Sequence, residues 1–227
     1  MKFLGRLLLL PVAAVALYHL WIFGCILYWK QANPSRTAFM TEQEVHLQDA
    51  NPDASLRHTW VNYAQISPHL KRALVASEDA KFLEHEGFDW EGIQAAWEKN
   101  LAKGHIVAGG STISQQLAKN LFLSSERTPW RKAEEAIITV MLEALLDKRR
   151  IFEIYLNVIE WGNGVFGAEA AARYYYRQPA ARLSAPQAAR LAAMVPNPRY
   201  YDTHRTDPRL TRKAAIIGRR MQYAEVP

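Results

Sequence analysis

Hydrophobic residues follow two different patterns along the chain. Residues 7–29 read LLLLPVAAVALYHLWIFGCILYW and contain no Lys, Arg, Asp or Glu. Beyond residue 66, apolar residues recur every three to four positions, which is the spacing of amphipathic helices. No run of alternating β-branched residues is long enough to predict a central sheet. The pattern therefore predicts a mainly α protein that begins with one continuous apolar helix.

The apolar segment 7–29 is long enough to be a transmembrane helix. At ~1.5 Å per residue it would extend roughly 34 Å, which covers the core of a bilayer. The alternative is a cleaved signal peptide, whose apolar region is shorter, about 7–15 residues, and ends in a small-residue cleavage site. The sequence that follows, ILYWKQANPS, has no A-x-A site. We therefore expect a retained transmembrane anchor at residues 1–30.

The rest of the chain divides into a connector and one helical domain. Residues 31–66 are expected to be a connector and irregular segment, because prolines and polar residues interrupt any periodic pattern. Residues 67–227 are expected to form the main domain. Capping and proline signals predict its first helix at 67–86, ended by Gly87. Further helices are expected at about 89–101, 111–122, 128–147, 150–159, 168–176 and 184–195, and from 207 onward.

Composition narrows the class of protein. The chain has 227 residues, of which 49% are hydrophobic and 22% charged, as in an ordered domain. Its net charge of +6 suits nucleic acid, an anionic membrane or a phosphate-bearing substrate. The single cysteine, Cys25, lies in the apolar segment, so no intrachain disulfide is expected. No H-E-x-x-H, C-x-x-C or G-x-S-x-G motif occurs, which argues against zinc proteases and serine hydrolases.

The stretch SEDAKFLEHEGFDW, residues 77–90, places several ionisable groups among large aromatics. On a continuous helix, Glu78 would share an apolar stripe with Phe82 and His85. A carboxylate in such a stripe is partly desolvated, which raises its pKa and makes it a candidate general base or acid. Asp79 flanks the stripe. The alternatives are a structural ion pair for Glu78 and a core-edge or capping role for His85.

A second polar stretch, residues 109–128, is a glycine-rich turn followed by a helix. The N–H groups at the helix N-terminus, together with the hydroxyls of Ser111 and Thr112, attract anions. The G-x-x-x-x-G-K-[ST] spacing of a nucleotide-binding loop is absent, so ATP chemistry is not expected. Lys119 and Arg127 are candidates to hold a phosphate or pyrophosphate. A capped surface helix with solvated cations is the alternative.

A second acid, Glu135, lies on the apolar face of the next predicted helix, and Arg131 is one turn before it. Two inward acids on separate helices, with phosphate-type cations, favour glycosyl chemistry over a metal centre. Residues 148–176 carry three glycines that permit close packing, so this stretch is expected to position the site.

Four of these stretches together resemble the peptidoglycan glycosyltransferase family, glycosyltransferase family 51. The family signatures look like E-D-x-x-F-x-x-H-x-G, G-x-S-T-x-x-Q-Q-x-x-K-N, R-K-x-x-E and K-x-x-x-L-E-x-Y-L-N-x-x-x-x-G-x-G-x-x-G. They occur here in order, with Phe152 in place of the usual Leu. The matching residues include Glu78, Asp79, Phe82, His85, Gly87, Ser111, Thr112, Gln115, Gln116, Lys119, Asn120, Arg131, Lys132, Glu135, Lys148, Glu153, Tyr155 and Asn157.

The resemblance implies a mainly α, lysozyme-like domain with two lobes around a cleft. With no S-x-x-K acylation motif in the chain, it implies the short, monofunctional form of the family. The implied activity is polymerisation of lipid II into β-1,4-linked glycan strands, with release of undecaprenyl pyrophosphate. The implied partners are lipid II, the growing glycan chain, membrane lipid and cell-wall synthesis proteins, and no nucleic acid. The catalytic domain is then expected on the periplasmic side of the inner membrane.

The resemblance also implies roles for individual residues. Glu78 would be the general base that deprotonates the 4-hydroxyl of the acceptor sugar. Glu135 would be the second acid, assisting the leaving group directly or by holding Mg²⁺ or Mn²⁺. No organic cofactor is expected. The implied substrate-binding residues are Asp79, Ser111, Thr112, Gln115, Gln116, Lys119, Asn120, Arg127 and Arg131.

Basic residues are concentrated near the C-terminus, where residues 182–220 hold nine of them against Asp202 and Asp207. This face suits anionic head groups, and a solvated surface is the alternative. Two other functions also remain open. A lysozyme-type hydrolase uses two acids in a cleft, although a sugar leaving group needs no cations. A non-catalytic anchored scaffold for wall synthesis is the second.

Overall fold

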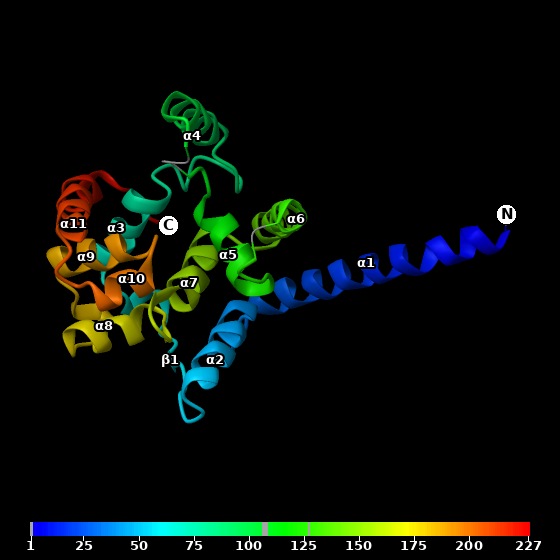
Figure 1. Cartoon of the computed structure of the whole chain (residues 1–227). Helices are drawn as coiled ribbons and strands as arrows, with labels where there is room; N and C mark the ends of the chain where they lie inside the picture. Colours follow the sequence, from blue (N-terminus) through cyan, green and yellow to red (C-terminus); the bar gives the residue numbers. More distant parts are fainter. Residues whose placement is uncertain (1, 106–108, 127) are drawn as a thin grey trace.

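The structure is a computed structural model that describes residues 2–105, 109–126 and 128–227, with side chains from residue 10 onward. It is mainly helical (Figure 1). The helices are α1 (Lys2–Trp29), α2 (Ala38–Ala50), α3 (Pro68–Glu78), α4 (Trp90–Lys103), α5 (Ile113–Phe122), α6 (Pro129–Leu145), α7 (Lys148–Val158), α8 (Ala168–Tyr176), α9 (Ala185–Met194), α10 (Pro198–Thr203) and α11 (Pro208–Arg220).

The helices beyond the anchor pack in two groups. In one group, α9 packs against both α3 and α11, and in the other, α5 packs against α2 and α6. Helix α7 contacts α5 and α6 of the second group and also contacts α8, and Figure 1 shows it in the middle of the domain. The mainly α, lysozyme-like architecture expected from the sequence is confirmed.

The expected first helix of the main domain, 67–86, is wrong beyond Glu78. Helix α3 begins after the N-cap Ser67, as predicted, but it ends at Glu78. The next residue, Asp79, has φ −162° and turns its carboxylate toward the N-terminus of α5, where Oδ2 accepts a hydrogen bond from the Ile113 N–H at 3.0 Å. Phe82 is fully buried from a turn that follows. The helical stripe argument therefore fails past residue 78.

The expected irregular connector also contains a helix. Helix α2 is capped by Thr37 and buries Met40 and Gln43 against the domain. An ion pair of 2.5 Å between Arg36 and Glu44 lies at its start. Sequence reasoning missed α2 because its apolar residues are not gathered on one face of the helix: Met40 is buried, whereas Val45 is exposed. Its stability depends on its N-cap and on its contact with α5. The periodicity of apolar residues contains no information on either.

Three very short strands tie the connector to the domain. They are β1 (Arg57–His58), β2 (Glu160–Gly162) and β3 (Val165–Phe166). Strand β3 pairs in parallel with β1 and antiparallel with β2. The turn between β2 and β3 contains Gly164 at φ +69°, a conformation that favours glycine. Strands of two or three residues carry no alternating pattern, so this small sheet was not predicted.

Helix α1 includes residues 10–29, which are long and apolar enough to cross a membrane by length and composition. Its C-terminal part packs on the domain, where Ile22 and Ile26 are fully buried. The Arg150 guanidinium of α7 reaches the end of this helix. Its Nε donates to the Trp29 carbonyl at 2.8 Å, and its Nη2 donates to the Ala32 carbonyl at 2.5 Å. Arg150 therefore connects the end of α1 to α7.

Replacing Arg150 with alanine should weaken the contact between the end of α1 and α7. The substitution removes charge-assisted hydrogen bonds to helix-end carbonyls, and we expect a loss of about 1–3 kcal/mol in the free energy of unfolding. Thermal unfolding in detergent should show a lower melting temperature, by about 2–4 °C per kcal/mol. Protease should also cut faster between α1 and α2. Arg72→Ala, at an exposed position of α3, is the matched control. Equal melting temperatures for the two variants would contradict this role.

Candidate active site

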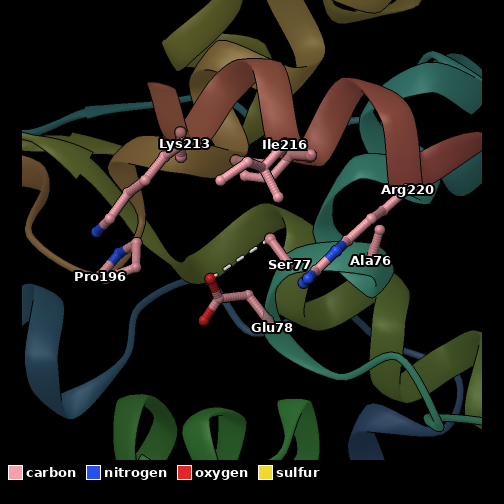
Figure 2. A pocket seen from close by; sticks show the side chains of 10 residues that line it. Ala76, Ser77, Glu78, Pro196, Lys213, Ile216 and Arg220 are labelled. Atoms are coloured by element: carbon pink, nitrogen blue, oxygen red, sulfur yellow. Dashed lines mark hydrogen bonds between the residues drawn. The ribbon is translucent and has the colours of Figure 1, made fainter. Parts of the chain in front are cut away.

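Glu78 is the last residue of α3, and its side chain is partly buried. Oε2 accepts a hydrogen bond from Nε2 of Gln116 on α5 at 3.0 Å. Oε1 lies 3.4 Å from the Ser77 hydroxyl, as the dashed line in Figure 2 shows. The carboxylate is thus held between two polar side chains from two different segments and does not turn outward into bulk solvent.

Burial raises the pKa of the Glu78 carboxyl above its ordinary value of 4.5. The hydrogen bonds from Gln116 and Ser77 oppose that effect, as does the positive charge of Lys213, while the negative charge of Asp79 adds to it. Desolvation is the largest of these effects. A carboxylate whose pKa is raised toward neutrality is better matched to accepting a proton in a reaction at neutral pH.

Glu78 lies between two neighbouring hollows in the protein surface. The first, about 240 Å³, is lined by Glu78, by Lys213 and Arg220, and by apolar residues of α3, α9 and α11. Figure 2 shows these three charged side chains entering the hollow from opposite sides. The second, about 230 Å³, also contains Glu78 and Arg220 and continues to Ser111. A proton acceptor therefore faces two cations across a shared space.

Sequence reasoning missed Lys213 and Arg220 as site residues. They belong to the basic segment that was assigned either to head groups or to solvent. The two cations are seven residues apart on α11, so they lie on one face of the helix, together with Ile216 and Ile217, which line the same hollow. This pattern, in which two cations lie on either side of an apolar pair on one helix face, could have identified Lys213 and Arg220 from the sequence.

Asp79 is buried and has both carboxylate oxygens engaged. One accepts from the Ile113 N–H, and the other lies 2.9 Å from Nε2 of His85. The Nδ1 atom of His85 accepts from the Gly87 N–H at 3.1 Å, so the ring proton must be on Nε2, where it is donated to Asp79. His85 thus bonds to a carboxylate and to a backbone N–H of its own turn, which fits the core-edge alternative. Asp79 holds the segment after α3 against the start of α5.

Several polar residues of α5 stabilise the helix itself. Thr112 and Gln115 are buried and form a capping box, and the Thr112 hydroxyl also donates to the Gly87 carbonyl at 2.7 Å. The Asn120 amide donates to the Gln116 carbonyl at 2.7 Å. Among the residues expected to bind substrate, these three are therefore engaged with the backbone.

Gln116, Lys119 and Asn120 itself also line a hollow. Gln116 bonds to Glu78 and also lines a third hollow of about 160 Å³, which includes Lys119 and Glu160. This third hollow shares Pro196 with the first. Ser111, just before the helix, is exposed and lines the second. Lys119 thus lies in a space adjacent to Glu78, but does not line the two hollows that Glu78 enters.

Glu135 is buried on α6 and carries two cations. Arg131, one turn earlier on the helix, donates to Oε2 at 3.0 Å, and Lys132 donates to Oε1. Lys132 also reaches the Ser111 hydroxyl at 3.5 Å, which connects this group to the second hollow. The alternative of a divalent cation at Glu135 fits these contacts poorly, because both carboxylate oxygens already accept from positive groups.

The ligands available near Glu135 also favour the ion pairs over a bound metal ion. No cluster of three or more His, Cys, Asp or Glu that could hold a metal ion occurs within the residues that the structure describes. The described residues around Glu135 therefore fit an ion-paired acid and offer no protein-only cage for Mg²⁺ or Mn²⁺. The remaining expected cation, Arg127, lies outside the described residues.

Replacing Glu78 with glutamine should stabilise the fold at neutral pH. The raised pKa means that ionised Glu78 is unfavourable in the folded state, so wild-type stability falls as pH rises above 4.5. The neutral amide avoids this cost. The variant should melt higher at pH 7–8, by roughly 2–4 °C for each kcal/mol gained, and the difference should vanish near pH 4. Glu84→Gln, at an exposed position, serves as control. A variant that melts lower than wild type at pH 8 would contradict the desolvation of Glu78.

Comparison with known proteins places the chain in a family. The family model described as Transglycosylase matches residues 44–222, which begins within α2. The chain is 73% identical to a biosynthetic peptidoglycan transglycosylase of Laribacter hongkongensis over the full length of both chains. It is 69% identical to one of Chromobacterium violaceum, covering 100% and 99% of the two chains, and 68% identical to one of Methylobacillus flagellatus, covering 98% and 97%. The chain belongs to the transglycosylase family.

Proposed function

We propose that this protein polymerises lipid II into β-1,4-linked glycan strands and releases undecaprenyl pyrophosphate, with Glu78 as the general base. Membership of the family makes the chain a peptidoglycan glycosyltransferase of cell-wall synthesis and not a hydrolase. The observation that supports the base assignment is a partly buried carboxylate, held by Gln116, that shares a hollow with Lys213 and Arg220.

The chemistry follows from this arrangement. Glu78 accepts the proton of the 4-hydroxyl of the acceptor N-acetylglucosamine. The oxygen then attacks C1 of the lipid-linked N-acetylmuramic acid, and the bond from C1 to the pyrophosphate oxygen breaks. The pyrophosphate leaves with the electron pair of that bond. Attack from the opposite side converts the α linkage to β. Because the pKa of Glu78 is raised, the proton transfer is better matched to neutral pH.

Cations around the hollows support a diphosphate leaving group. Lys213 and Arg220 line the hollows of Glu78, and Lys119 lines the adjacent one. Such groups stabilise negative charge that develops on phosphate oxygens. At α6, Arg131 and Lys132 share the single charge of Glu135, which leaves this group net positive. We assign Glu135 the role of orienting these two cations.

The hydrogen-bond partners of the other acids also argue against a lysozyme-type mechanism. Hydrolysis of a glycosidic bond uses two carboxyl groups on either side of that bond. The second acid of this site, Glu135, is buried and paired with two cations, and Asp79 has both oxygens engaged. Neither carboxylate has an oxygen free of these partners to act as a second acid with Glu78.

We propose that α1 anchors the protein as a single pass in the inner membrane, with the catalytic domain in the periplasm. The apolar length of residues 10–29 supports the anchor. A lipid-linked substrate gives it a purpose, because tethering enzyme and substrate to one surface raises their effective concentration.

Glu78→Gln should abolish glycan polymerisation while the protein stays folded. Purified full-length protein is incubated with lipid II, and chain growth is followed by gel electrophoresis. We expect a loss of at least about 100-fold in rate, the low end for a general base. Glu84→Gln should polymerise at the wild-type rate. A parallel incubation with purified polymer tests the hydrolase alternative. Wild-type rates in Glu78→Gln, or cleavage of polymer without any chain growth, would refute the proposal.

Chelation should leave the reaction running, because the Glu135 site is occupied by side-chain cations. The same polymerisation assay is run with EDTA and then with added Mg²⁺ or Mn²⁺. We expect the rate with EDTA to stay within about twofold of the untreated rate, since Arg131 and Lys132 already donate to both carboxylate oxygens of Glu135. A rate that EDTA abolishes and either metal restores would contradict the ion-pair description of Glu135.

A further inference from the structure

We propose that Tyr155 is a positioning residue for the glycosyl transfer, because its buried hydroxyl fixes the amide of Gln116 with the NH₂ group toward Glu78. The inference rests on the proposed role of Glu78 as base. Tyr155 then contributes to the reaction, although its hydroxyl is linked to Glu78 only through the amide of Gln116.

Three helices contribute one side chain each to this relay. The hydroxyl of Tyr155 on α7 donates to Oε1 of Gln116 on α5 at 3.0 Å. Nε2 of the same amide donates to Oε2 of Glu78, at the end of α3, at 3.0 Å. Tyr155 is completely buried in the core, and its ring stacks with that of Phe152, with 6.2 Å between the ring centroids. The hydroxyl therefore has a fixed position.

The chemistry of the three groups sets the direction of both bonds. An ionised carboxylate can only accept hydrogen bonds, whereas an amide has one donor end and one acceptor end. If the Gln116 amide were flipped, its oxygen would face the oxygen of Glu78, which is favourable only when Glu78 is protonated. A phenol hydroxyl bonded to Oε1 opposes that flip. Burial raises the pKa of Tyr155 well above its ordinary value, so the hydroxyl keeps its proton and remains a donor.

This direction matters because Glu78 must be ionised to act as a base. Burial favours its protonated form, and so does the charge of Asp79. Lys213 favours the ionised form through its charge, and Arg220, also on α11, faces the same hollow. The Gln116 N–H opposes the effect of burial with a directed hydrogen bond. Tyr155 thus keeps available the shorter of the two hydrogen bonds to the carboxylate, since Gln116 donates at 3.0 Å and Ser77 at 3.4 Å.

Tyr155→Phe tests the relay, because it removes only the hydroxyl. We expect the acid limb of kcat/KM against pH to move up by about 0.5–1 unit. At pH values below the pKa of Glu78, kcat/KM of the variant should be roughly three- to tenfold lower than that of the wild type. At higher pH the two values should converge. KM for lipid II should change little, because Tyr155 lines none of the three hollows described above. Tyr175→Phe removes another hydroxyl, one that donates to the Trp161 carbonyl, and should leave the limb in place.

A double-variant cycle separates positioning from packing. Gln116→Leu should itself raise the acid limb, and adding Tyr155→Phe to it should give no further shift, because the relay is already broken. Additive shifts would show that Tyr155 acts without Gln116 and would overturn the proposal. If Tyr155→Phe fails to fold, 3-fluorotyrosine at position 155 replaces it. Its more acidic hydroxyl is a stronger donor, so the limb should move to lower pH, and an unmoved limb would count against the relay.

The outcomes also distinguish this inference from the proposed function. Polymerisation at the wild-type rate by Glu78→Gln would remove the base itself. An inactive Glu78→Gln, together with an acid limb in Tyr155→Phe that matches that of Tyr175→Phe, would leave Glu78 as the base and overturn only the role of Tyr155.

Discussion

The active-site arrangement depends on one buried hydrogen bond, from the Ile113 N–H to the carboxylate of Asp79. This bond satisfies a free N–H at the start of α5 with a negative charge, the combination that a helix N-terminus favours. It also takes Asp79 out of the helical path, so α3 ends at Glu78. As a result, the last side chain of α3 lies beside α5, where Gln116 can bond to it. The position of the base is thus a consequence of how two helices meet.

Opposing electrostatic effects act on Glu78. Burial makes its ionised form costly, and the raised pKa records that cost. The charge of Lys213 on α11 and the hydrogen bonds from Gln116 and Ser77 reduce the cost without removing it. A fully solvated carboxylate would be a weaker base, and a fully neutralised one would hold its charge too tightly to accept a proton. The site therefore gives up some stability for reactivity, which is why a neutral residue at position 78 is expected to strengthen the fold while it removes the activity.

Much of the fold could be predicted from local signals, and the failures have a common cause. Caps and prolines marked the starts of α3, α6 and α9 correctly, because each depends on a few adjacent residues. The end of α3, the existence of α2 and the small sheet all depend on contacts between distant segments. The same holds in the site. Glu78 and Glu135 could be picked out from their own helices. Lys213 and Arg220 became part of the site only when α11 packed against α3.

The stretch at residues 111–120 shows why a sequence signature is not a list of substrate contacts. Thr112 and Gln115 close a capping box, and Asn120 bonds to the backbone one turn earlier. These residues hold the helix in place. Gln116 and Lys119, three positions apart, lie on the same side of the helix and line one hollow. Structural and chemical roles are thus mixed along a single helix, since Asn120 bonds to the backbone and also lines the hollow of Gln116 and Lys119. A substitution at Thr112 or Gln115 should act through the position of Gln116 and one at Gln116 or Lys119 through the reaction itself, so loss of activity alone cannot assign a role to either.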